Sequence, residues 1–526
     1  MATQTSSLKK ISLAELAKHN NEDSAWVAIN GKVFDLTDFI DGHPGGKRIL
    51  MGVIGKECTQ QFVQFHNVAT VMGTYGPKLV IGELDGAEKE APKPSTELFG
   101  ELIPYGDPSW YQGWKSVFYN ESHKRLRTYI REVTDRELTP FAFQFENDKQ
   151  VPRTLYSSFG QRGLLVPALG MRPWPSKYAP CDPPGGVKPS EWNIFHELIM
   201  ADEMSRCAST GIVAALTTGP SIALPVISSF ASDYLKEKII KDVLSGKKTI
   251  CLAVSEPYAG SDIANLQTRG EKTPDGKHFI VSGEKKWITN GVWSDYFVTL
   301  VRTGGSGASG LSFLLLERGM PGLTTRAVHA QGNIGSGTAY VMMDKVKVPV
   351  ENVIGVEGQG FKYSVFNFNH ERLGICMGTV RQARMCYEEA MRYANKRKTF
   401  GQFLIEHGVI RNKFGHMARM IEATQAWLEM ICYNWDKMTK EEADKALSGP
   451  IALCKAQCSI TFELCAREAS QIMGGIAYTK GGQGERVERL YRDVRGAAIP
   501  GGSEEIMLDF GIRQQLKVAR AMGARI

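Results

Sequence analysis

Hydrophobic and polar positions follow two different rhythms along this chain, and the changes of rhythm divide it into regions. A helical period of about 3.6 residues runs through residues 114–134, 193–205 and 231–244. Short β-type runs punctuated by glycine follow, at residues 279–281, 296–301, 311–316 and 339–343. Helical periodicity then returns over residues 361–395, 409–438, 443–473 and 503–521. The pattern predicts a helical region, a small β domain and a helical bundle, in that order.

The first 84 residues show a third pattern, that of a compact mixed unit. Two β-rich runs, 26–29 and 32–36, are separated by Asn30-Gly31, a strong signal for a tight hairpin. Helical pieces follow, and residues 79–82 predict a closing strand. Residues 85–108 mix charge with proline and can bury little, which predicts a linker that lets the N-terminal unit swing or dock.

Length supports several domains, because 526 residues are too many for one core. We therefore expect a multidomain α+β protein. Its predicted parts are an α+β unit at 8–84, a linker at 85–108, a helical domain at 109–249, a β domain at 250–356 and a helical bundle at 357–526.

Composition narrows the function classes. The net charge is +7, but residues 1–90 hold 9 Lys/Arg and 11 Asp/Glu, so the remainder carries 54 against 45, a net of +9. A mildly basic body suits a polyanionic small substrate and lacks the dense stripe of a nucleic-acid binder. No apolar run reaches ~18–20 residues, and no secretory h-region opens the chain, so we expect neither a membrane span nor secretion. The ten cysteines, including Cys454, Cys458 and Cys465, are interpreted as buried thiols in a reducing compartment rather than as zinc ligands.

Two histidines in the N-terminal unit suggest a haem. His43-Pro44-Gly45-Gly46 follows an apolar pair, and its glycines let the backbone approach a flat cofactor. His66 lies 23 residues later beside Phe62 and Phe65, which could wall an apolar pocket. Two axial imidazoles favour electron transfer over oxygen chemistry. These residues resemble the signature of cytochrome b5, which implies b-type haem with His43 and His66 as iron ligands.

Two blocks in the β region suggest a flavin. They are Ser255-Glu256-Pro257-Tyr258-Ala259-Gly260-Ser261-Asp262 and Trp287-Ile288-Thr289-Asn290. Hydroxyls and amides suit the polar edge of a flavin, and an aromatic side chain suits its apolar edge. From Tyr105 to the C-terminus the chain resembles an acyl-CoA dehydrogenase. The resemblance implies that family's fold, with a helical N-terminal domain, a β-barrel or sandwich middle domain and a C-terminal four-helix bundle.

The same resemblance implies which residues bind FAD. One group belongs to the β region: Leu252, Val254, Ser255, Ser261, Trp287 and Thr289. A second group belongs to segments that reach the cofactor of a neighbouring subunit in this family: Arg397, Thr399, Phe400, His407, Gln471 and Gly475. Ser503 and Glu505 complete the set, and Ser261, Asn369, Arg372 and Gly502 are the implied substrate contacts. A homodimer or homotetramer is therefore expected.

The catalytic base is expected at an unusual position. Many acyl-CoA dehydrogenases carry a glutamate in the late segment where this chain has Gly501, which cannot accept a proton. Other members place the base in a Glu-Arg-Leu segment, which here is Glu371-Arg372-Leu373. Glu371 is the predicted base, and Glu504 and Glu505 are the alternatives.

The resulting hypothesis is an FAD-dependent acyl-CoA dehydrogenase that desaturates a medium- or long-chain thioester, as in fatty acid β-oxidation. Its haem domain would act as relay or outlet, with an electron-transfer flavoprotein or dioxygen as further acceptors. A flavin monooxygenase or oxidase on the same fold remains an alternative, as does a non-catalytic scaffold with a haem carrier. Ala524-Arg525-Ile526 resembles a peroxisomal signal, and a cytoplasmic location is the alternative.

Overall fold

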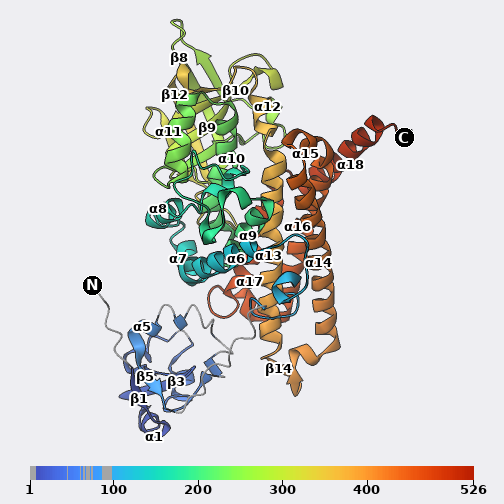
Figure 1. The fold of residues 1–526 in the computed structure, drawn as a ribbon. Coiled ribbons are helices and arrows are strands. Elements are labelled where there is room, and N and C mark those ends of the chain that lie inside the picture. Colours follow the sequence, from blue (N-terminus) through green and yellow to red (C-terminus); the bar gives the residue numbers. More distant parts are fainter. Residues whose placement is uncertain are drawn as a thin grey trace.

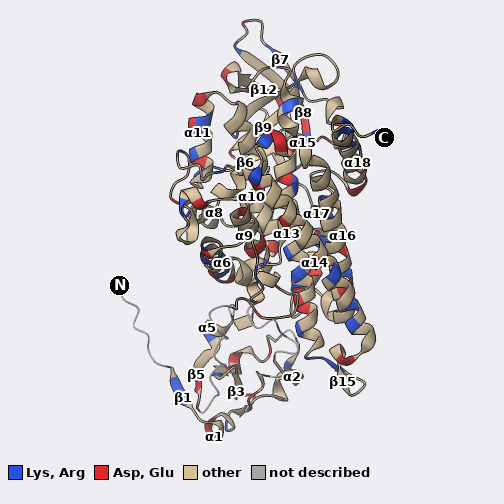
Figure 2. Cartoon of the chain, turned by 45° about the vertical axis from the view of Figure 1, so that its right-hand side comes forward, with Lys and Arg blue, Asp and Glu red and all other residues tan. Residues whose placement is uncertain are grey.

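The computed structural model describes residues 8–43, 45–59, 61–62, 66, 71–72, 75–85 and 98–525. Figure 1 shows the N-terminal unit at one end, strands β8–β12 at the other, and long helices running between them. Acidic and basic residues are interspersed along these helices in Figure 2, without a stripe of one sign in that view. The order predicted from the hydrophobic rhythm, helices then strands then helices, is confirmed.

The N-terminal unit is built around a five-stranded sheet of order β1-β5-β4-β3-β2. Its elements are β1 (Lys9–Ile11), α1 (Leu13–Leu16), β2 (Asn20–Asn21), β3 (Ser24–Ile29), β4 (Lys32–Asp35), α2 (Lys47–Met51), α5 (Gly76–Leu79) and β5 (Val80–Leu84). Asn30 and Gly31 both have positive φ, 48° and 73°, as a type I′ hairpin turn requires. The predicted hairpin and closing strand are therefore present.

Helices form the next region, α6 (Glu121–Val133), α7 (Ala142–Asn147), α8 (Arg153–Gln161), α9 (Ile194–Ser205), α10 (Thr210–Phe230) and α11 (Asp233–Leu244). Helix α6 starts later than the predicted residue 114, because the Asn120 side chain accepts from the backbone N–H groups of Ser122 and His123. Asn193 caps α9 in the same way. The rings of His123 and His196 stack at 4.0 Å and join the two helix starts.

An eight-stranded sheet follows, with order β11-β12-β8-β7-β9-β10-β13 and β6 paired to β9. Its strands are β6 (Ile250–Ala253), β7 (Arg269–Lys272), β8 (His278–Ile288), β9 (Tyr296–Arg302), β10 (Leu311–Glu317), β11 (Leu323–Ala327), β12 (Ala339–Pro349) and β13 (Val353–Ile354). Strands β9 and β10 are buried along almost their whole length, which explains why they read as continuous apolar runs.

The C-terminal region is helical. It contains α12 (Gly360–Val365), α13 (Phe368–Ala394), the hairpin β14 (Lys398–Thr399) and β15 (Gln402–Phe403), α14 (Gly408–Lys437), α15 (Lys440–Ala446), α16 (Ser448–Met473), α17 (Glu485–Ala498) and α18 (Glu504–Ala521). The single helix predicted for 443–473 is divided at Leu447. Pro450 has no N–H to continue the hydrogen-bond ladder back to Ala446, so α16 starts afresh.

Helix α10 is the central helix of the helical region. In the described part of the chain it is the one helix long and apolar enough to cross a membrane, with a mean hydropathy of 1.6. However, 67% of that window is buried inside the protein. Gly219 lets α10 lie directly on β6, since a Cβ there would come within 2.1 Å of the Ile250 carbonyl oxygen. The apolar side chains of α10 are therefore explained by burial in the protein core.

Part of the predicted linker is docked on the body. Phe99 donates its N–H to Tyr111, and the Arg127 guanidinium lies over the Phe99 ring at 3.8 Å. Asp107 is buried among three arginines and bonds Arg381 at 2.9 Å. These charges hold the pKa of the Asp107 carboxyl well below its usual value although burial opposes them. Residues 98–107 are thus fixed to the body and form what we call the strap.

Candidate active site

The two predicted haem ligands face each other in the N-terminal unit. The ring centroids of His43 and His66 lie 5.8 Å apart, which leaves room for one metal atom between them. His66 Nδ1 lies 3.0 Å from the Phe62 carbonyl oxygen. Because a carbonyl can only accept, Nδ1 carries the proton and Nε2 is left for a metal. Burial lowers the pKa of His66, so the ring is neutral, as a ligand must be.

The His43 ring is held by close packing. A Cβ on Gly45 would lie 2.7 Å from His43 Cε1, so only glycine allows this ring position. His43 Nδ1 is buried without a hydrogen-bond partner in the described residues. Phe62 stacks on His66 at 4.5 Å and Phe39 approaches His43 edge-on at 6.2 Å. The site therefore has two opposed imidazoles between aromatic walls and fits a haem. Pro44 and Phe65 lie outside the described residues.

In the body, the Ser255 loop is fixed by a buried ion pair. Lys285 Nζ lies 2.8 Å from Glu256 Oε1 and also donates to the Val254 carbonyl. The Glu256 carboxylate accepts the backbone N–H groups of Gln267 and Thr268. Burial lowers the pKa of Lys285 to about 8, so the pair is charged at neutral pH. Leu252, Val254 and Ser255 are half-buried beside it, while Ser261 is exposed.

Trp287 ends strand β8 in a strained and open conformation. Its φ is +67°, and its side chain is 55% exposed despite its place at the edge of the core. A bulky residue with positive φ is uncommon and marks functional sites. Lys286 lies over the indole at 4.6 Å, and Thr289 is half-buried two residues later. An exposed indole beside hydroxyls and backbone amides fits the predicted flavin site.

Two asparagines tie this segment to helix α10 and to the predicted base. The Asn290 amide bridges the Ala215 carbonyl and the Gly219 N–H inside the helical ladder. Two residues further along α10, the Ser221 carbonyl accepts from Asn367 Nδ2 at 3.0 Å. That carbonyl is available because Pro225 cannot donate to it. The contacts of Asn290 and Asn367 with this helix were not predicted, although two prolines within one apolar run were a signal that backbone groups of this helix are free.

Glu371 lies in the first turn of α13, beside Asn367. Asn367 Nδ2 approaches Glu371 Oε1 at 3.4 Å. Burial raises the pKa of Glu371 to about 8, while Asn367 and Arg372 oppose the shift. The side chain is nevertheless partly accessible, as a group that receives a substrate proton must be. Desolvation with one orienting donor gives a carboxylate of raised basicity.

The late glycine turn lies against the same helix. Arg372 Nε donates to the Gly501 carbonyl oxygen at 2.8 Å, and the buried Lys455 donates to the carbonyls of Ala498 and Gly502. Both glycines have positive φ. Ser503 caps α18, and the Glu505 side chain is exposed. Asn369 instead bonds Asp444 at 2.9 Å.

The second set of predicted FAD-binding residues does not meet the first set, in the β region, within one chain. Arg397, Thr399 and Phe400 form a hairpin at the end of the bundle opposite the β sheet (Figure 1). Its turn has φ of +51° at Phe400 and +82° at Gly401, and the Phe400 side chain is 97% exposed. His407 bonds back to Thr399 at 3.2 Å. Gln471 and Gly475 are exposed on α16 and directly after it.

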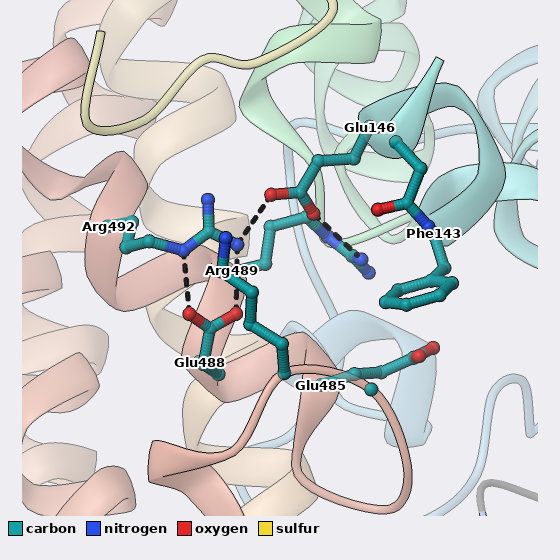
Figure 3. A pocket seen from close by; sticks show the side chains of 9 residues that line it. Phe143, Glu146, Glu485, Glu488, Arg489 and Arg492 are labelled. Carbon is teal, nitrogen blue, oxygen red and sulfur yellow. Dashed lines mark hydrogen bonds and ion pairs between the residues drawn. The ribbon is translucent and has the colours of Figure 1, made fainter. Parts of the chain in front are cut away.

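Two recesses in the body are candidates for the substrate site. One of about 390 Å³ is lined by Gly170, Arg172, Asn367, His370, Trp435, Asp436, Met438, Thr439, Lys440 and Ala443. It shares Asn367 with the Glu371 site. The other lies between α7 and α17, where Glu146 pairs with Arg492 at 2.6 Å and Arg492 with Glu488 at 2.7 Å (Figure 3). These ion pairs connect a helix of the N-terminal helical domain to a helix of the C-terminal domain.

Comparison with known proteins follows the same division of the chain. Family models match as the acyl-CoA dehydrogenase N-terminal domain at 120–247, middle domain at 251–346 and C-terminal domain at 358–516. A relative from Emericella nidulans, acyl-CoA dehydrogenase apdG, is 42% identical over 80% of this chain and 96% of its own length. The chain belongs to the acyl-CoA dehydrogenase family.

Other matches agree. Acyl-CoA dehydrogenase AFT10-1 of Alternaria alternata is 38% identical over 80% of this chain and 97% of its own. The crystal structure of an acyl-CoA dehydrogenase from Geobacillus kaustophilus has a TM-score of 0.68 at 26% identity and covers 76% of this chain and 100% of its own. Residues 12–85 match the cytochrome b5-like heme/steroid binding domain. This acyl-CoA dehydrogenase is therefore an FAD-dependent oxidoreductase that carries a haem-binding domain, and the predicted family, fold and cofactors are confirmed.

Proposed function

We propose that this enzyme removes two hydrogens from the α and β carbons of an acyl-CoA thioester, with Glu371 as the base. The observation that carries the proposal is the position of Glu371. It is a half-buried carboxylate in the first turn of α13, and desolvation raises its pKa to about 8. The α-proton of a thioester is weakly acidic, so its removal needs a desolvated carboxylate held in place. FAD, when bound, supplies the acceptor for the β-hydride.

The chain's own residues would orient the reaction. Asn367 directs one carboxylate oxygen of Glu371 through its amide, and that amide is itself fixed by the Ser221 carbonyl. Arg372 and Lys455 hold the Gly501–Gly502 turn by its carbonyls. The N–H groups of this turn are thereby left for the thioester oxygen, where negative charge develops as the proton leaves.

We also propose a medium or long acyl chain and an entry route for the thioester. The 390 Å³ recess touches Asn367 and His370, one residue before Glu371. Its wall is rigid, because His370 Nε2 bonds Glu197 at 2.8 Å and Glu197 bonds Arg172 at 3.0 Å. Its lining holds two cations, Arg172 and Lys440, beside one carboxylate, Asp436, and the two cations suit a polyanionic thioester. Lys440→Ala should raise KM for acyl-CoA with little change in kcat, whereas Lys445→Ala, an exposed residue on the same helix α15, should change neither.

The haem domain is proposed as the one-electron outlet of the same enzyme. His43 and His66 would both ligate the haem iron, and a haem held in this way would supply one-electron transfer rather than substrate or dioxygen chemistry. An electron-transfer flavoprotein and dioxygen are the other candidate acceptors. The strap fixes to the body the C-terminal end of the segment that connects the haem domain. The haem domain therefore stays near the body of its own chain.

Assembly would complete the flavin site. Phe400 at the hairpin tip and Gln471 are both exposed in a single chain. A homodimer or homotetramer in which they reach a neighbour's FAD accounts for their exposure. Sedimentation equilibrium checks this, and a stable monomer with full FAD occupancy would contradict it. Peroxisomal location is proposed from Ala524 and Arg525, which are exposed beyond α18, and imaging of an N-terminally tagged protein tests it.

An anaerobic titration with saturated acyl-CoAs of different length tests the function as a whole. Flavin absorbance should bleach with the preferred chain length, and the haem bands should then change to those of the ferrous form. His43→Ala should keep the bleaching and lose the haem response. If no acyl-CoA bleaches the flavin, desaturation is wrong, and an oxidase or a non-catalytic scaffold takes its place.

A further inference from the structure

Three cysteines that the proposed reaction does not use meet between α13 and α16. Cys376 belongs to α13, and Cys454 and Cys458 belong to α16. Their sulfur atoms all lie within 4.8 Å of one another, and all three side chains are buried. Cys454 and Cys458 are four residues apart on one helix face, with Sγ atoms 3.9 Å apart. No other group of three potential metal-ligating residues occurs in the described part of the chain.

This spacing is that of a metal site. Three sulfurs around one metal at about 2.3 Å would lie roughly 3.8–4.0 Å from one another, so small side-chain rotations close the observed triangle. Thiolates select soft cations such as Cu(I) and Zn(II) over Mg²⁺ or Ca²⁺. We propose that Cys376, Cys454 and Cys458 form a trisulfur site for one thiophilic cation, Cu(I) or Zn(II).

The charges of such a site can be balanced in place. Binding replaces three thiol protons by one cation, and the three protons are released to solvent. Zinc would leave a net charge of −1 and copper(I) a net charge of −2 on the cluster. Lys455, next to Cys454 in sequence and three residues before Cys458, is buried, and its ammonium donates to the carbonyls of Ala498 and Gly502. A fixed cation on the same helix would therefore offset part of this charge.

The sequence alone did not predict this group. Cys454, Cys458 and Cys465 share one helix and were interpreted as buried thiols rather than as zinc ligands. The fold leaves Cys465 outside the group and brings in Cys376, 78 residues before Cys454 in the chain. Because the third ligand comes from the neighbouring helix, a bound cation would fasten α13 to α16. Cys376 lies five residues beyond Glu371, and Lys455 holds the Gly502 carbonyl. The site would therefore stabilise the frame behind the active site without touching substrate.

The test uses the full-length holoenzyme, reduced with a phosphine and freed of metals by a chelator. One portion is incubated with Zn²⁺ and another, without oxygen, with Cu⁺. After gel filtration, metal content is measured by mass spectrometry relative to protein, flavin and haem iron. We expect one added Zn or Cu per chain. Cys376→Ser, Cys454→Ser and Cys458→Ser should each lower retention at least tenfold. Cys386→Ser, which changes a buried cysteine of α13 outside the trio, should retain the metal.

X-ray absorption at the metal edge provides a measurement that does not depend on the variants. Wild-type protein should show a shell of three sulfurs at about 2.2–2.3 Å. The proposal is overturned by retention no higher than that of Cys454→Ser, by a shell of nitrogen and oxygen only, or by a disulfide among the three cysteines that excludes metal. If a serine variant does not bind flavin and haem normally, the absorption result on wild type decides. Failure here leaves the proposed dehydrogenation unaffected, because that reaction is measured separately by flavin bleaching.

Discussion

Arg372 donates a hydrogen bond from its Nε to the carbonyl oxygen of Gly501, at 2.8 Å. This bond joins the two places where a catalytic glutamate is expected in this family, since Arg372 follows Glu371 directly. A Cβ on Gly501 would lie 3.0 Å from Ile375 Cδ1, so that position already touches the same helix. Residues 371 and 501 therefore border the same space from two sides, and of these two positions only residue 371 carries a carboxylate.

Glu371→Gln should abolish most of the activity while FAD stays bound. The amide keeps the size and the Asn367 contact but cannot take a proton, so flavin reduction should slow by at least ~10²–10⁴-fold. Stopped-flow reduction by acyl-CoA measures this, with Glu132→Gln, a change of an exposed glutamate on α6, as the control. Near-normal flavin reduction in Glu371→Gln would indicate that Glu504 or Glu505 is the base. The double change Gly501→Glu with Glu371→Gly should restore little, because φ is +71° at residue 501 and glutamate is strained there.

The same substitution should stabilise the protein at high pH. The pKa of Glu371 is raised from the ordinary 4.5 to about 8 in the fold, so the folded state binds a proton more tightly than the unfolded chain. Stability is then lost as pH rises from about 4.5 to 8. Glu371→Gln removes this loss, which is on the order of 5 kcal/mol at pH 9 for a pKa raised from 4.5 to about 8, and should change little at pH 4.5. Urea unfolding at both pH values measures it. An equal effect at both would show that Glu371 is not desolvated.

Two glycine substitutions distinguish an effect on the position of the haem ligand His43 from a general effect on the loop. Gly45→Ala places a Cβ 2.7 Å from His43 Cε1, whereas Gly42→Ala meets only the Phe39 carbonyl oxygen at 3.7 Å. Gly45→Ala should therefore lose or weaken the low-spin haem spectrum, as His43→Ala and His66→Ala should, and Gly42→Ala should keep it. Haem content is read from the Soret band at equal protein concentration. Full haem binding by His66→Ala would refute the bis-histidine site.

Breaking the ion pair under the Ser255 loop should cost stability and FAD. Lys285→Met leaves the Glu256 carboxylate buried without its cation, which costs about 3–5 kcal/mol. The double variant Lys285→Met with Glu256→Gln should recover part of that loss, since no uncompensated charge remains. Thermal unfolding and FAD stoichiometry measure both variants. If the single and double changes are equally damaging, the pair contributes through packing rather than through charge.

Pro225→Ala should make the protein more stable and less active. Alanine restores an N–H that competes with Asn367 for the Ser221 carbonyl, and it removes a helix-interior proline, which can cost ~3 kcal/mol. We expect a higher melting temperature and a several-fold slower flavin reduction. Pro220→Ala is the matched control, because it returns a donor to the Leu216 carbonyl, for which no contact with either asparagine is found. An unchanged rate of flavin reduction in Pro225→Ala would show that the Ser221 carbonyl does not position Asn367 for the reaction.

Sequence reasoning succeeded where a residue acts locally. The Asn30-Gly31 hairpin and the strand-like runs of β9 and β10 depend on neighbours in sequence. It did not find Asn290, Asn367 or Lys455, because each acts on backbone groups of a distant segment. Cys376 was likewise not connected with Cys454, since only the packing of α13 on α16 joins them. The docking of Phe99 and Asp107 was hidden because the segment looks polar and proline-rich.

Under the proposed electron transfer from flavin to haem, the strap changes how the haem domain meets the body. Only twelve residues separate Asp85 from Leu98, and thirteen virtual Cα–Cα steps can span at most about 45 Å. A tether this short keeps the haem domain at an effective local concentration on the order of millimolar. Encounter with the flavoprotein body is then unimolecular and insensitive to dilution. A separately expressed haem domain would have to be supplied at a comparable concentration to match it.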